Sequence, residues 1–68
     1  MQIIITLIDR KGERDLAVNS KQALKDTMII LGVNGKKVYS HRLNTDVDIN
    51  KSYDDNGIFY GDKLEVKG

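Results

Sequence analysis

The sequence predicts an α+β fold in which one helix packs on one face of a mixed sheet of four or five strands. Three observations predict it. The chain opens on an apolar run rich in β-branched residues, one segment in the middle has helical periodicity, and the last segment alternates polar and apolar residues. The 68 residues suffice for one small domain, spanning 1–68.

The first strand is predicted over residues 2–8, QIIITLI, where isoleucine dominates. Side chains alternate between the two faces of a strand, so apolar residues on both faces indicate either a central strand or an outer face exposing apolar groups. One face would carry Ile3, Ile5 and Leu7, and the other Gln2, Ile4, Thr6 and Ile8.

A turn is predicted over residues 9–12, with Gly12 free to adopt a positive φ. Residues 13–18 then return as a second strand, which completes an N-terminal β-hairpin. Basic residues cluster at this hairpin, namely Arg10, Lys11 and Arg14.

The helix is predicted after Asn19 and Ser20, since both are good N-cap residues. Gly32 follows the last periodic residue and is a natural C-cap. Ile29 and Ile30 are expected to flank the apolar stripe and widen it. The stripe itself comprises Ala23, Leu24, Thr27, Met28 and Leu31.

The remaining segments are shorter and less regular. Residues 32–35 predict a turn, and residues 36–43 a third strand whose inward face the pattern leaves open. Residues 44–50 suggest a short edge strand or an extended loop, and residues 51–57 a loop or a single 3₁₀ turn. Residues 63–67 close the chain as a strand with Leu64 and Val66 inward.

The element order, two strands, a helix and then further strands, is that of the β-grasp arrangement. The opening residues Met1, Gln2 and Ile3 look like those of ubiquitin, and residues 52–64 (SYDDNGIFYGDKL) resemble the closing corner of ubiquitin-like proteins of the YukD/EsaB type. Those proteins are encoded with the type VII (WXG100) secretion machinery of Gram-positive bacteria. Tyr53 departs from that pattern, because leucine is usual at its position. The resemblance implies a cytoplasmic accessory or regulatory component of that machinery.

Composition narrows the functional classes. Without cysteine, the chain has neither disulfides nor a cysteine-based metal site. A net charge of +1 argues against nucleic acid as a partner, and the short apolar run at the N-terminus argues against a signal peptide or direct membrane insertion. Residues 1–45 nevertheless carry a balance of +4 and residues 46–68 one of −3, a split that can orient a docking partner.

No motif predicts catalysis, a metal or a cofactor. Residues 46–50 imitate the start of a calcium loop, but Lys51 and Gly57 stand where glycine and a bidentate glutamate are needed. His41, the only histidine, has no nucleophile placed beside it by a motif. Residues 32–37 lack the spacing of a phosphate loop.

A surface for another protein is the remaining functional prediction. If Ile3, Ile5 and Leu7 face the helix, the opposite face of the first strand and the adjoining turn form the expected binding surface. The alternatives are a carrier or modifier acting through a C-terminal glycine, and a stand-alone adaptor unrelated to secretion. The residues expected to bind protein are Ile4, Thr6, Ile8, Arg10 and Lys11.

Overall fold

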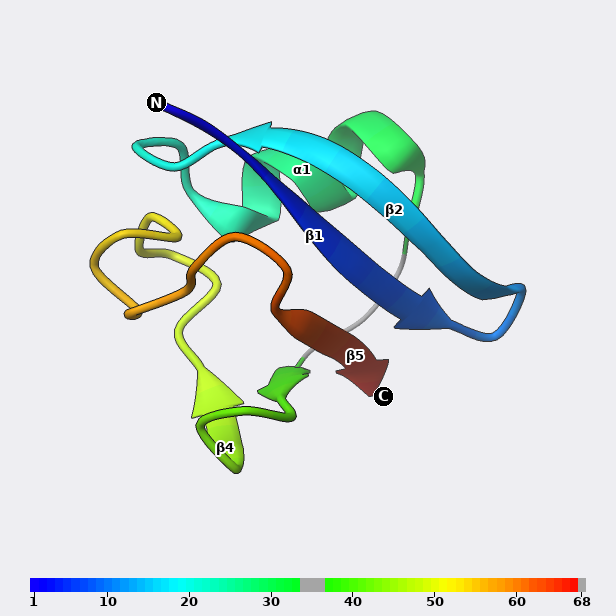
Figure 1. The fold of residues 1–68 in the computed structure, drawn as a ribbon. Helices are drawn as coiled ribbons and strands as arrows, with labels where there is room; N and C mark the ends of the chain where they lie inside the picture. The colour runs from blue at the N-terminus through cyan, green and yellow to red at the C-terminus, as the bar shows by residue number, and fades with distance from the viewer. Residues whose placement is uncertain (34–36, 68) are drawn as a thin grey trace.

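Five strands form one mixed sheet, and a single helix packs on one of its faces in the computed structural model, which describes residues 1–33 and 37–67 (Figure 1). The strand order across the sheet is β2-β1-β5-β3-β4. The elements are β1 (Gln2–Asp9), β2 (Gly12–Asn19), α1 (Leu24–Leu31), β3 (Lys37–Ser40), β4 (Thr45–Val47) and β5 (Lys63–Lys67).

The sheet is mixed because β1 pairs antiparallel with β2 and parallel with β5, while β3 pairs antiparallel with both β5 and β4. The hairpin predicted at residues 9–12 is confirmed, with β1 and β2 in register from Gln2 opposite Asn19 to Asp9 opposite Gly12. Gly12 has φ 120° and supplies the backbone conformation that closes the turn. This mixed sheet with one helix is compatible with the predicted β-grasp arrangement.

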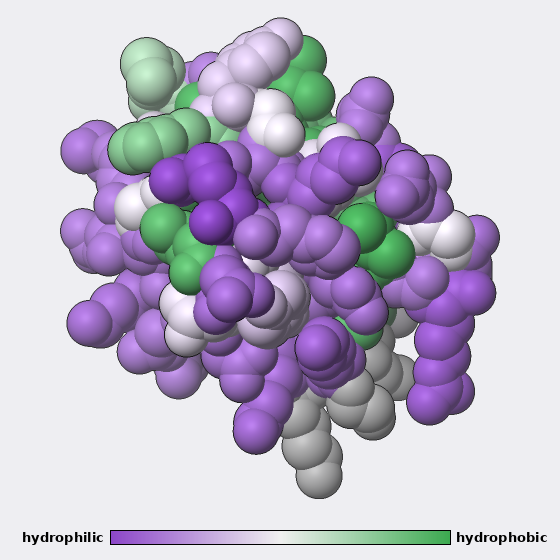
Figure 2. Space-filling model, turned by 60° about the horizontal axis from the view of Figure 1, so that its bottom comes forward, coloured by the Kyte–Doolittle hydropathy of each residue, from purple (hydrophilic) through white to green (hydrophobic). Residues whose placement is uncertain are grey.

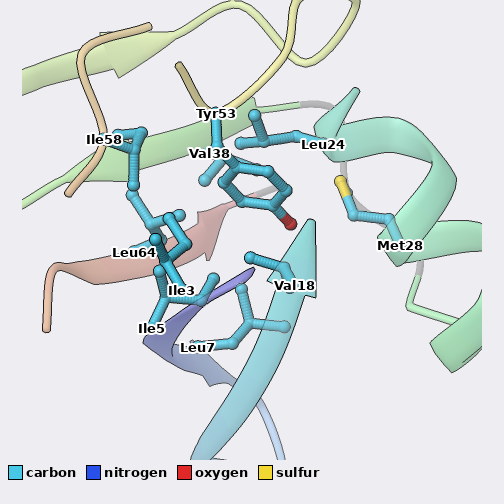
Figure 3. Packing of buried hydrophobic residues seen from close by; sticks show 10 residues of the cluster. All are labelled: Ile3, Ile5, Leu7, Val18, Leu24, Met28, Val38, Tyr53, Ile58 and Leu64. Atoms are coloured by element: carbon cyan, nitrogen blue, oxygen red, sulfur yellow. The ribbon is translucent and has the colours of Figure 1, made fainter. Parts of the chain in front are cut away.

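The condition on which the binding surface was predicted is met by the first strand. Ile3, Ile5 and Leu7 are all buried and lie in the core between the sheet and α1. Figure 3 shows the Tyr53 ring among Leu24 and Met28 of the helix and side chains of the sheet. The ten buried hydrophobic residues are Ile3, Ile5, Leu7, Val18, Leu24, Met28, Val38, Tyr53, Ile58 and Leu64.

The predicted helix start is wrong. The Asn19 side chain accepts a hydrogen bond from the Lys21 N–H at 3.0 Å, so it stabilises a turn that contains the buried Ser20. The helix begins at Leu24 after Ala23, which makes no side-chain cap. Its first free N–H groups instead donate to loop carbonyls: Leu24 to Lys51 (3.3 Å) and Lys25 to Ile49 (3.0 Å).

Two further expectations on the helix have different outcomes. Gly32 is the C-cap, with φ 67° in the left-handed region, as predicted. Ile29 and Ile30 do not widen the buried stripe: they are 74% and 76% exposed. At 100° per residue they lie about 140° and 240° around the helix from Leu24, so the core contacts neither.

The third strand is shorter than predicted. β3 ends at Ser40, and residues 41–44 form a turn in which Asn44 adopts φ 55° and the Leu43 N–H donates to the Ser40 hydroxyl. Val38 and Ser40 point inward, which settles the face left open by the pattern. Residues 44–50 do contribute a short edge strand, β4. The predicted turn over 32–35 and the first residue of the predicted strand, Lys36, fall largely outside the described residues.

Between β4 and β5 the chain runs irregularly and is held by two buried side chains, Tyr53 and Ile58, which are 2% and 1% exposed. The Tyr53 hydroxyl donates to Thr27 Oγ1 on the helix at 2.9 Å. The Asn56 amide donates to the carbonyls of Asp48 and Ser52, and Gly57 supplies a turn at φ 73°. The loop is therefore a packed part of the fold.

A charged pair closes the corner before β5. The buried Asp62 carboxylate accepts hydrogen bonds from Arg42 Nε (2.7 Å) and from the Phe59 N–H (2.8 Å), and Arg42 also donates to the Gly57 carbonyl. The Arg42 guanidinium lies 4.5 Å from the centre of the Phe59 ring. Burial alone would raise the pKa of Asp62, but these hydrogen bonds outweigh it and hold the pKa below its ordinary value near 3.8.

Tyr53→Ala should lower the free energy of unfolding by about 3–5 kcal/mol, because it leaves a cavity at the centre of a small core. Tyr53→Phe should cost about 1 kcal/mol through the lost hydrogen bond to Thr27. Urea unfolding followed by circular dichroism measures both.

Burial raises the pKa of Tyr53, so stability should be retained below pH 10 and fall above it.

Tyr60→Ala is the matched control, since Tyr60 is 70% exposed and its loss should change stability by no more than about 0.5 kcal/mol. Equal stabilities of Tyr53→Ala and Tyr60→Ala would contradict the packing of Tyr53.

Asp62→Asn should destabilise the protein at neutral pH by roughly 1–3 kcal/mol, because it weakens hydrogen bonds between charged partners. The folded pKa of Asp62 is depressed, so its contribution is present above its unfolded pKa near 4 and disappears as the pH falls through the folded value. Chemical unfolding between neutral and acidic pH should therefore show a smaller acid loss for the variant than for the original protein. Asp46→Asn, at an exposed position of β4, should follow the original protein throughout.

Candidate functional site

The outer face of the sheet, turned away from α1, carries three of the five residues predicted to bind protein. Ile4, Thr6 and Ile8 alternate with the buried residues of β1 and so share this face. Ile4 is 41% exposed, whereas Thr6 and Ile8 are half-buried. The strand periodicity thus brings these three side chains to one face.

Polar neighbours surround Ile8 on this face, whereas Ile4 is opposite Ala17 on β2. Thr6 lies between the two isoleucines and donates a hydrogen bond to Asp15 Oδ1 at 2.7 Å. Ile8 is opposite Glu13 on β2 and beside Glu65 on β5. On the face turned forward in Figure 2, the apolar residues likewise form separate areas within a hydrophilic surface.

Aromatic and charged side chains occupy the β3 and β5 part of the outer face. The Tyr39 ring meets the His41 ring edge-on with centres 5.9 Å apart, and Lys67 Nζ lies 4.4 Å from the centre of the same tyrosine ring. His41 Nε2 is 3.1 Å from Glu65 Oε1. These contacts hold the imidazole against a carboxylate and an aromatic ring, and the Tyr39 hydroxyl itself donates to Asn44.

Arg10 and Lys11 are not on the outer face. They form the exposed tip of the β1–β2 hairpin and line a cavity of about 320 Å³ between that tip, the end of α1 and the end of β5. The structure therefore divides the predicted site in two. The remaining lining residues are Asp9, Arg14, Leu31, Gly32, Val33, Val66 and Lys67.

An ion pair inside the hairpin forms one wall of this cavity. Arg14 Nη2 donates to Asp9 Oδ2 at 2.9 Å, and the Lys11 N–H donates to Asp9 Oδ1 at 2.8 Å. The Lys11 hydrogen bond, opposed by burial and reinforced by Arg14, lowers the pKa of Asp9 from its usual value. Asp9 therefore stays ionised at neutral pH and partners Arg14.

Apart from Ile4, six large apolar residues of the described chain are exposed and were not predicted for the site, and four of them lie in two pairs; the other two are Met1 and Leu43. Ile29 and Ile30 lie on the solvent side of α1, which their angular positions on the helix indicate. Phe59 and Tyr60, 63% and 70% exposed, follow the buried Ile58, and no sequence period marks them. The Gly61 N–H donates to the Ile4 carbonyl at 2.7 Å, so this aromatic segment runs beside exposed Ile4.

Within residues 1–33 and 37–67, no cluster of three or more histidine and acidic side chains is arranged to hold a metal ion. The helix seen there is neither long nor apolar enough to cross a membrane. Comparison with protein-family models, with curated proteins and with solved structures finds no match to this chain.

Proposed function

We propose that this protein is a non-catalytic module that binds another protein through the outer face of its sheet and the adjoining hairpin. The observation that carries the proposal is the exposure of Ile4 next to the Phe59–Tyr60 segment, joined by the hydrogen bond from Gly61. An aliphatic side chain and two aromatic rings left in water are costly for solubility. Such residues are enriched where proteins bind each other.

The sheet supports a finer proposal about the fold. A helix that joins the second and third strands, together with a parallel pair of the first and last strands at the centre, fits a ubiquitin-like β-grasp. We propose this fold for the chain. The resemblance of residues 52–64 to YukD/EsaB-type proteins then makes components of a type VII secretion system in the cytoplasm the first partners to test.

The contacts of the single histidine support a non-catalytic role. A general base needs a nucleophile or substrate within hydrogen-bond reach. His41 instead pairs with Glu65 and packs on Tyr39. This arrangement suits a surface that presents charge and aromatic edges to a partner.

Combining Ile4→Asp with Ile8→Asp should weaken partner binding by about tenfold or more, since buried charges would replace apolar contacts at the interface. Affinity capture from the source organism, followed by mass spectrometry, identifies the partner. Titration of the purified partner then measures the change in its dissociation constant.

The pair Ile29→Asp and Ile30→Asp is the matched control, because it changes two exposed isoleucines on the opposite layer. It should leave partner binding unchanged. Amide NMR spectra must show that both double variants remain folded. Binding that survives the Ile4 and Ile8 changes in a folded variant would refute the outer-face proposal.

A further inference from the structure

We infer that the cavity at the hairpin end of the domain binds an acidic peptide segment of a partner, with one aliphatic side chain inserted into the cavity. The inference rests on the proposed protein-binding function and specifies the chemistry of the partner. It depends on the shape, the apolar floor and the charge of this cavity.

The cavity exists because the helix is short. Eight helical residues extend about 12 Å, whereas the eight residues of β1 and of β2 extend about 26 Å. The helix ends at Leu31, and the sheet continues beyond it to the hairpin tip. The resulting space of about 320 Å³ is at the lower end of the range for ligand sites.

The floor of the cavity is apolar and its rim is basic. Leu31, Val33 and Val66 are half-buried residues packed against the core, and they supply the floor. Arg10 and Lys11 are exposed at the rim, and neither forms a salt bridge among the residues that the structure describes.

The other charged residues that line the cavity already interact with other groups of the protein, apart from one donor atom. Asp9 is neutralised by Arg14, and the Lys67 ammonium lies over the Tyr39 ring. Arg14 Nε, however, is buried without a hydrogen-bond partner in the described part of the chain. Because this atom is buried, the cavity offers an anionic ligand only the two cations at its rim, Arg10 and Lys11.

These features favour a peptide over a phosphate. A phosphate site is typically built from free backbone N–H groups. Here the N–H groups of Gly32 and Val33 already donate to the carbonyls of Ile29 and Met28. An aliphatic side chain flanked by carboxylates instead uses the apolar floor and the basic rim together.

The probe is an acetylated, amidated pentapeptide with a central leucine and two acidic residues on each side, titrated into ¹⁵N-labelled protein. The amide signals of Leu31, Gly32, Val33 and Val66 should shift with saturation. Replacing the central leucine by serine should weaken binding about fivefold, because the apolar contact is lost. Raising the salt from about 50 mM to about 0.5 M should weaken it severalfold.

Arg10→Glu combined with Lys11→Glu should weaken binding about tenfold. Both residues are exposed at a turn, so the fold should persist, and Arg10→Gln with Lys11→Gln provides a milder second variant. Lys25→Glu with Lys51→Glu, an equal change of charge at exposed positions elsewhere, should leave binding unchanged.

Three results would overturn the inference. They are shifts centred on Ile4 and Ala17 rather than on the cavity, equal weakening by the Lys25 and Lys51 control, or tighter binding of inorganic phosphate or of anionic lipid vesicles than of the peptide. If the peptide fails while the Ile4 and Ile8 variant still loses its partner, this inference falls and the proposed function stands. If the peptide binds as described while that variant keeps its partner, the outer-face proposal is refuted and the cavity proposal is retained.

Discussion

A short helix on a long hairpin is the constraint that shapes this domain. α1 has only eight residues, so it covers the middle of the inner face and leaves both ends of the sheet uncovered. At the end near Ile4, the irregular segment before β5 inserts Tyr53 and Ile58 into the core. At the hairpin end, an ion pair and a cavity take the place of further packing.

The loop that completes the core also defines where the helix begins. Carbonyls of Ile49 and Lys51 accept hydrogen bonds from the first helical N–H groups, and Ala23 forms an isolated bridge with Ser52. A helix of this length gains little stability from propensity alone, so tertiary contacts must supply it. The helix, the loop and the buried tyrosine therefore stabilise one another, and destabilising one of them should destabilise the other two.

The parts of the fold set by short-range periodicity were predictable, and those set by distant contacts were not. Alternation in β1 placed Ile3 and Ile5 on one face and Ile4 on the other, and Gly32 marked the helix end. The helix start was misplaced because its cap comes from residues far along the chain. Of the candidate site, the outer-face residues followed from alternation. The cavity beside Arg10 could not be predicted, because it depends on how far α1 reaches along the sheet.

The hydrogen exchange of individual amides tests this interdependence most directly. The Ile58 N–H donates to the Tyr53 carbonyl at 2.9 Å and the Asp54 N–H to the Ser20 carbonyl at 2.9 Å. If the loop is part of the cooperative core, both amides should exchange with the same free energy as the slowest amides of β1, through global unfolding. Rapid exchange of both by local opening, while β1 stays protected, would show that the loop is an appendage and contradict this account of the fold.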